Sequence, residues 1–143
     1  MRIDISCMFS LSEKKIFVTG AHGFVGVPLV KALESRGAIV LAPTRSECDI
    51  MIAEQVTEYV RQADVVVHLA AFVGGIGFNR EHPAEMWLRN LQMGINILEA
   101  ARMNRVQKVL LCGTVCAFPK VPPHIPFSES DIWMGYPEET NAP

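Results

Sequence analysis

The sequence has no large excess of charge of either sign. It contains 13 lysines and arginines against 15 aspartates and glutamates, which gives a formal net charge of -2. Proteins that bind nucleic acid or an anionic membrane through electrostatics usually carry a basic patch, and this balance provides none. We therefore expect no nucleic-acid partner, no membrane partner, and a small molecule as the ligand.

Cysteine is scarce, and the start of the chain has no long apolar run. The four cysteines include no C-x-x-C pair and are too few to staple a small domain, which favours a reducing compartment. No His, Cys, Asp or Glu spacing is typical of a metal site. Residues 1–11 are interrupted by Asp4 and lack the basic start and apolar stretch of a signal peptide. We expect a cytoplasmic protein that holds no metal.

What is present is an alternation of strand and helix patterns. Half of the residues are hydrophobic and a fifth are charged, as in a globular protein. Short apolar runs predict strands at 15–18, 38–42, 64–69 and 108–112. Helical spacing predicts helices from Val25 to just before Gly37, at 53–61 and at 83–104, and residues 113–143 are predicted to be irregular. This order is typical of an α/β fold, a Rossmann-type doubly wound parallel sheet.

The helix predicted at 83–104 has two stripes of different polarity. We expect its buried face to be the apolar stripe, and its solvated face to be the polar stripe. The apolar stripe is Ala84, Leu88, Leu91, Ile95 and Leu98, and the polar stripe is Glu85, Arg89, Gln92, Asn96 and Glu99. Three other residues, Asn90, Trp87 and Met93, are expected to point inward, Asn90 with a partner for its amide.

A glycine pattern between the first strand and the first helix is the strongest local signal of function. It reads G-x-x-G-x-x-G and comprises Gly20, Ala21, His22, Gly23, Phe24, Val25 and Gly26. Glycines at these places permit a tight turn and a close approach of backbone to a pyrophosphate, which the N-terminus of the next helix also attracts. The pattern predicts a dinucleotide site; the alternative is a glycine-rich turn that binds nothing.

The end of the second predicted strand indicates which dinucleotide is bound. NAD-binding folds usually place an acidic residue there to bond the ribose 2′-hydroxyl, but this sequence has Arg45 and no carboxylate in the segment 43–46. A guanidinium matches the 2′-phosphate of NADP in charge and geometry. NADP is therefore the predicted cofactor, with NAD as the alternative, and an arginine that is merely solvated remains open.

Polar residues also follow the fourth and third predicted strands. Thr114 and Cys116 come just after the fourth strand, outside the carboxyl ends where open α/β sheets bind ligands. A hydroxyl there can bond a substrate oxygen, although threonine commonly ends strands and cysteine is commonly buried. His68, at the end of the third strand, is interpreted as a hydrogen-bonded core histidine.

Together these motifs resemble the extended short-chain dehydrogenase/reductase family, the NAD-dependent epimerases/dehydratases, over residues 15–143. The similarity is greatest to the GDP-L-fucose synthase subgroup, through the segments 68–76 (HLAAFVGGI), 113–120 (GTVCAFPK) and 138–143 (EETNAP), with Pro83 and Asn90 between them. The resemblance implies C3 and C5 epimerisation of GDP-4-keto-6-deoxy-D-mannose, followed by NADPH reduction of its C4 ketone. Another nucleotide-sugar epimerase or dehydratase, or a non-catalytic NADP-binding module, are the alternatives.

The resemblance also implies roles for single residues. Thr114 matches the residue that bonds the C4 oxygen, and Cys116 matches a cysteine acid/base. His22 matches a position that often holds an arginine near the 2′-phosphate, and Leu69, Ala70 and Ala71 are expected to line the cofactor site.

In the family a Tyr-x-x-x-Lys follows the segment that ends here at Pro143, and the sequence contains none. We therefore expect an extension at 1–14 and, at 15–143, an NAD(P)-binding Rossmann domain truncated before the substrate domain. The chain is thus expected to be the N-terminal, cofactor-binding part of an enzyme that is inactive alone. The full-length form is expected to be a homodimer joined through the helix at 83–104, using Met86, Met93, Ile97 and Ala100.

Overall fold

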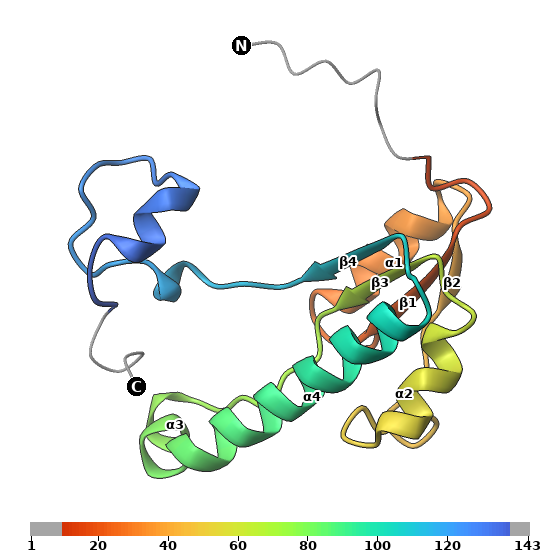
Figure 1. Cartoon of the computed structure of the whole chain (residues 1–143), viewed down its shortest axis with the longest axis horizontal. Coiled ribbons are helices and arrows are strands. Elements are labelled where there is room, and N and C mark those ends of the chain that lie inside the picture. Colours follow the sequence, from red (N-terminus) through yellow and green to blue (C-terminus); the bar gives the residue numbers. More distant parts are fainter. Residues whose placement is uncertain (1–9, 138–143) are drawn as a thin grey trace. The chain divides into compact units, whose positions relative to one another are not determined.

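The computed structural model describes residues 10–137, which divide after Leu111 into two compact units. The first unit is a parallel four-stranded sheet with helices on both faces, in the strand order β2-β1-β3-β4 (Figure 1). Its elements are β1 (Lys15–Thr19), α1 (Gly26–Glu34), β2 (Ile39–Leu41), α2 (Ala53–Val60), β3 (Val65–His68), α3 (Ile76–Glu81), α4 (Pro83–Met103) and β4 (Lys108–Leu111). The predicted α/β, doubly wound parallel sheet is confirmed.

Alternation along the two central strands gives the sheet a core on each face. Ile16 and Val18 of β1 pack with Val65 and Val67 of β3 against α1. The residues between them, Phe17 and Val66, face the other way and pack against α2 and α4 with Val56, Val60, Ile97, Ala100 and Ala101. Successive side chains of a strand point to opposite faces, so runs buried on both faces are continuously apolar. This is why the two short runs form the centre of the sheet.

The order of the strands places a switch point between β1 and β3. From β1 the chain continues to β2 on one side of β1. It then returns through α2 to β3, which pairs with the other edge of β1 and places Thr19 opposite His68. Crevices for ligands form outside the carboxyl ends of the strands at such a point. The end of β1 and the end of β3 therefore frame the expected site.

The prediction of which face of the long helix α4 is buried was wrong. Leu88, Leu91, Ile95 and Leu98 are exposed, as is Trp87, whereas Met93, Ile97, Ala100 and Ala101 are buried. Asn96, predicted to be solvated, is buried because its amide donates to the Ile50 carbonyl oxygen (2.9 Å) and accepts from Gln92 (2.8 Å). The buried stripe ends in small residues that let α4 lie close to α2 and the sheet.

The second unit begins at Cys112 and contains two short 3-10 helices, η2 (Val115–Ala117) and η3 (Glu129–Trp133), within the segment predicted to be irregular. A capping box starts η3, since Asp131 accepts from the Ser128 N–H (2.7 Å) and from the Ser128 hydroxyl (2.9 Å). The Ser128 N–H is the main reason why the pKa of Asp131 is lowered, and His124 Nε2 lies 3.4 Å away. Phe118 stacks on Phe127 with ring centroids 5.0 Å apart.

Among the described residues, no helix combines the length and the apolar character needed to cross a membrane.

Candidate functional site

The glycine turn joins β1 to α1 and has no room for a side chain at Gly20 or at Gly26. Gly20 has a positive φ of 68°, and a Cβ there would lie 2.8 Å from the Ala70 nitrogen. A Cβ on Gly26 would lie 2.5 Å from the carbonyl of Ala21. The turn is closed by a hydrogen bond from Gly23 N–H to the Gly20 carbonyl oxygen (3.0 Å). Only glycine permits this backbone to pass so close to the end of β3.

The N-terminal end of α1 follows the glycine turn directly, and its Val27 N–H donates to the Gly23 carbonyl oxygen (3.0 Å). No side chain caps this end, and its first turn contains no acidic residue. The helix dipole makes such an end attractive to a phosphate. The close-packed backbone at Gly20 and Gly26, together with a helix start that no side chain caps, therefore suits the pyrophosphate of a dinucleotide.

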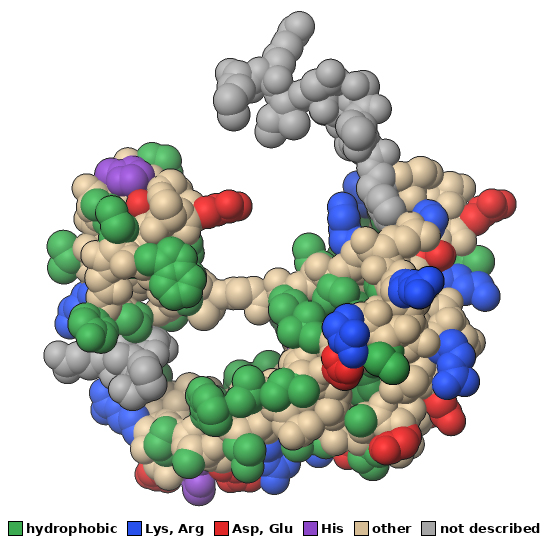
Figure 2. Space-filling view, viewed as in Figure 1, with side chains coloured by type: hydrophobic (Ala, Val, Ile, Leu, Met, Phe, Trp, Pro, Cys, Tyr) green, Lys and Arg blue, Asp and Glu red, His purple; other side chains and the backbone are tan. Residues whose placement is uncertain are grey.

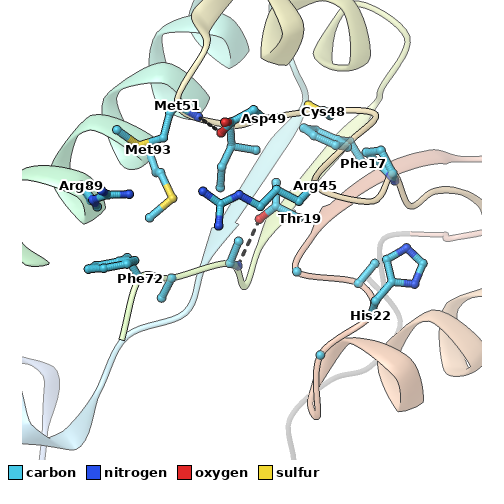
Figure 3. A pocket seen from close by; sticks show the side chains of 17 residues that line it. Phe17, Thr19, His22, Arg45, Cys48, Asp49, Met51, Phe72, Arg89 and Met93 are labelled. Carbon is cyan, nitrogen blue, oxygen red and sulfur yellow. Dashed lines mark hydrogen bonds between the residues drawn. The ribbon is translucent and has the colours of Figure 1, made fainter. Parts of the chain in front are cut away.

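A pocket of about 270 Å³ opens beside this turn (Figure 3). It lies at the switch point, because its lining joins the end of β1 and the turn, the loop after β2, the segment after β3, and α4. The lining residues are Phe17, Thr19, Gly20, Ala21, His22, Gly23, Pro43, Arg45, Cys48, Asp49, Ile50, Met51, Ala70, Ala71, Phe72, Arg89 and Met93.

The expected cofactor residues are distributed unequally around this pocket. Gly20, Ala21, His22, Gly23, Arg45, Ala70 and Ala71 line it. Phe24 and Val25 are exposed and Gly26 is buried at the start of α1, while the Leu69 side chain packs on the core under α1. The first group is thus brought together as the sequence predicts, and the second belongs to the frame of the site or to its outer surface.

Thr19 ties the ends of the two central strands together. Its buried hydroxyl accepts from the Ala70 N–H (3.2 Å) and lies 2.7 Å from His68 Nδ1. Burial lowers the pKa of His68, so the imidazole is neutral at pH 7. The interpretation of His68 as a hydrogen-bonded core histidine is confirmed, and the pair holds Ala70 against Gly20.

The loop after β2 is folded so that Arg45 projects over the pocket. Glu47 accepts from both the backbone N–H (2.7 Å) and the hydroxyl (2.8 Å) of Thr44, which lowers the pKa of Glu47. Within the described part of the chain, the Arg45 guanidinium has no hydrogen-bonded or ion-paired partner, and Figure 3 shows it extending across the pocket toward Met93. His22 bonds the Ala42 carbonyl oxygen through Nε2 (3.0 Å), which fixes the turn to the end of β2.

The sequence analysis missed the opposite wall, which Phe72 and Arg89 build. Asn90 points inward as predicted: its Oδ1 accepts from the Phe72 N–H and its Nδ2 donates to the Phe72 carbonyl oxygen, both at 2.8 Å. The neighbouring Arg89 lies over the Phe72 ring, with 4.6 Å between Cζ and the ring centroid. The inward amide of Asn90 was the one sequence signal that could have placed its neighbour near the site.

Thr114 and Cys116 lie in the second unit, at the start of η2. The Thr114 Oγ1 accepts from the Cys116 N–H (3.2 Å), and both residues are exposed. Cys112, Cys116 and the buried Cys48 are free thiols. Burial and two nearby carboxylates raise the pKa of Cys48, so this pocket-lining thiol is a poor nucleophile. No cluster of three or more His, Cys, Asp or Glu residues suited to a metal occurs among residues 10–137.

Comparison with known proteins agrees with this geometry. The model of the NAD dependent epimerase/dehydratase family matches residues 16–141. The chain belongs to this family. It is 35% identical to the GDP-L-fucose synthase of Escherichia coli K12 over 136 residues, which are 93% of this chain and 42% of that enzyme. It is also 35% identical to the GDP-L-colitose synthase of Yersinia pseudotuberculosis over 108 residues, 74% of this chain and 35% of that enzyme.

A solved structure of another family member has the same arrangement of elements. The GDP-L-fucose synthetase of Naegleria fowleri bound to NADP superposes with a TM-score of 0.73 at 26% identity, covering 94% of this chain and 40% of that one. The chain thus spans about two-fifths of the length of the relatives that it matches.

Proposed function

We propose that this chain is the NADP(H)-binding part of a nucleotide-sugar epimerase/reductase of the GDP-L-fucose synthase kind. The observation that carries the proposal is the pocket at the switch point, which the glycine turn at Gly20 to Gly23 and the unpartnered Arg45 both line. When bound, NADPH would supply the hydride for reduction of a C4 ketone. The glycine turn would hold its pyrophosphate through backbone N–H groups, and Arg45 would hold its 2′-phosphate.

The preference for NADP over NAD rests on the carboxylates near the pocket as well as on Arg45. A bond to the ribose 2′-hydroxyl of NAD needs a free acidic group close to the end of β2. Glu47 is engaged by Thr44, and Asp49 accepts from the Met51 N–H (3.0 Å). Each of these carboxylates has one oxygen bonded within the chain, whereas the Arg45 cation has no partner among the described residues.

Two residues of the second unit are proposed for the chemistry on the sugar. The ketone acidifies the neighbouring C–H bonds, so epimerisation needs an acid/base group and donors that stabilise the oxyanion. We assign the donor role to Thr114 and the acid/base role to Cys116, whose thiol is free and exposed. This assignment follows the similarity to GDP-L-fucose synthases, and the substrate is taken to be a GDP-4-keto-6-deoxy sugar.

The cofactor proposal predicts that replacing Arg45 lowers the affinity for NADPH but not the affinity for NADH. In Arg45→Gln, NADPH affinity is expected to fall by about tenfold or more, as the loss of a charge-assisted hydrogen bond would give, while NADH affinity stays unchanged. Isothermal titration calorimetry with both cofactors measures this. The matched control is Arg36→Gln, because Arg36 bonds the Ala32 carbonyl oxygen at the end of α1 and does not line the pocket.

Two results would contradict this prediction. Equal affinity of the unaltered chain for NADPH and NADH would refute the preference. Failure of a chain that circular dichroism shows to be folded to bind either cofactor would refute the site itself.

A second prediction concerns self-association, for which we propose a second copy of the protein packed along α4. The predicted use of this helix is kept, but Met93, Ile97 and Ala100 are buried in the core and cannot form the interface. The available surface is the exposed row Leu88, Leu91, Ile95 and Leu98, which is visible as hydrophobic side chains over α4 (Figure 2). Contiguous apolar surface of this kind usually contacts another protein surface.

Leu91→Glu combined with Leu98→Glu is therefore expected to convert dimers to monomers at micromolar concentration, measured by sedimentation velocity. A matched double substitution of exposed apolar residues in the second unit, Val121→Glu with Met134→Glu, should leave the dimers intact. A native chain that sediments as a monomer would refute the interface.

A further inference from the structure

We propose that Arg89 of α4 is a second cationic ligand of the cofactor, donating to one of its phosphate groups from the wall opposite the glycine turn. This inference rests on the proposed function, because it needs a phosphorylated nucleotide in the pocket. Arg89 lines the pocket together with Arg45, and Figure 3 shows it across the pocket from His22.

Arg89 is held in place before any ligand arrives. Its Nη2 lies 2.8 Å from Glu85 Oε1, one turn earlier on α4, and its guanidinium carbon lies over the Phe72 ring, 4.6 Å from the centroid. Stacking on an aromatic ring uses the face of the guanidinium and leaves its in-plane N–H groups able to donate. The ion pair with Glu85 is partly exposed on both sides and therefore contributes little to the position of Arg89, but the negative charge of Glu85 opposes a phosphate that approaches this cation.

Two neighbours hold the Phe72 residue beneath Arg89, one through its backbone and one through its ring. Asn90 binds both polar groups of the Phe72 backbone, and Phe78 of α3 meets the Phe72 ring edge-on at 5.8 Å between centroids. The ring of Phe78 in turn packs against His82 and occupies the space where a side chain on Gly74 would lie. Because Phe72 cannot shift, it works as a platform that orients Arg89 along the pocket wall.

The charges that face the pocket favour more than one phosphate. Of the lining side chains, Arg45 and Arg89 are cationic and Asp49 is the one carboxylate, with its oxygen engaged by Met51 N–H. The other titratable groups there are His22, bonded to Ala42, and the thiol of Cys48. This arrangement places two cations in the lining, beside the glycine turn, for the negative charges of a dinucleotide.

The test compares Arg89→Gln with Arg102→Gln in calorimetric titrations with NADPH and NADH at low and high salt. Arg102 is the matched control, since it lies on the same helix in a similar ion pair, with Glu99, but outside the pocket. Arg89→Gln is expected to weaken NADPH binding by about tenfold and to flatten its salt dependence, whereas Arg102→Gln stays within about twofold. A loss for NADPH alone assigns the contact to the 2′-phosphate, and an equal loss for both cofactors assigns it to the pyrophosphate.

Glu85→Gln provides a second measurement that does not remove Arg89. Without the ion pair, the Glu85→Gln variant is expected to bind NADPH about twofold more tightly. This measurement can be made even if Arg89→Gln does not fold. If the native chain binds NADPH but a folded Arg89→Gln binds equally well with the same salt dependence, the inference is wrong while the proposed function stands. Unchanged or weaker binding by Glu85→Gln overturns it as well. Absence of binding by the native chain refutes the proposed function instead.

Discussion

Gly26→Ala is expected to weaken NADPH binding strongly and to destabilise the fold. A Cβ at this first residue of α1 would overlap the Gly20 carbonyl oxygen and lie 2.5 Å from the Ala21 carbonyl, and these are backbone atoms that cannot rotate away. The turn must therefore move away from α1, which displaces the donors that face the pyrophosphate. We expect affinity to fall by about a hundredfold, as for one or two lost charge-assisted hydrogen bonds. Unfolding free energy should fall by about 1–3 kcal/mol, as for other overpacked sites.

The matched control is the same substitution at Gly94, in the middle of α4. A Cβ there meets nothing within 4 Å, so Gly94→Ala should leave binding unchanged and raise stability by about 0.5–1 kcal/mol through helix propensity. Calorimetry at a temperature where both variants are folded measures affinity, and urea unfolding measures stability. Binding by Gly26→Ala within about threefold of the native chain would show that the turn does not hold the phosphates.

The strands and the glycine turn could be predicted because their signals are local. Residues 65–67 are apolar on both sides because both faces of β3 are covered, and this makes a continuous run in the sequence. The positive φ at residue 20 and its close contact with Ala70 both require glycine there. The spacing of the glycines in the sequence therefore indicates the geometry of the turn. The order of strands and helices then fixes the fold class and places the site at the end of β1.

The face that α4 buries could not be predicted, because the helix carries two apolar stripes. The row from Leu88 to Leu98 is more hydrophobic than the buried row of Met93, Ile97, Ala100 and Ala101, and helical periodicity fits both. What decides between them is close packing against α2 and the Ile50 carbonyl oxygen, which favours alanines and the amide of Asn96. Those contacts join residues far apart in the sequence and leave no local signal.

Part of the pocket was missed for a related reason. The wall formed by Phe72 and Arg89 depends on α3, a six-residue helix too short to give a periodic pattern, and on the rotation of α4. Because α4 faces the segment after β3 with Asn90, the neighbouring Arg89 lies at the pocket. Single residues of the site can therefore be predicted where the backbone requires them, but not where side chains from two helices meet.

The chain of 143 residues is expected to bind NADPH without reducing a GDP-4-keto-6-deoxy sugar. In the family a tyrosine protonates the C4 oxygen while a lysine four residues later lowers the pKa of that tyrosine. Neither tyrosine of this chain is followed by such a lysine, since Ala63 and Thr140 stand four residues after Tyr59 and Tyr136.

Tyr59 is also unsuited by its position. This residue of α2 is partly buried against the core and stacks on Phe17 at 5.4 Å, and desolvation raises its pKa, which is opposite to the shift that the reaction needs. Tyr136 is exposed and lies in the second unit. A positioned general acid contributes about a hundred- to ten-thousand-fold to the rate, so Thr114 and Cys116 alone should give no detectable turnover.

The measurement follows NADPH absorbance with the keto-sugar nucleotide, using the Escherichia coli GDP-L-fucose synthase as the positive control and calorimetry to show that the chain under test is folded and binds NADPH. The expected result is a rate at least about ten-thousand-fold below that of the control, because the acid is missing and the substrate is poorly oriented. Turnover close to the control rate would mean that another residue of this chain supplies the proton. In that case Cys116→Ser and Tyr136→Phe would identify the acid, and the roles proposed for Thr114 and Cys116 would have to be reassigned.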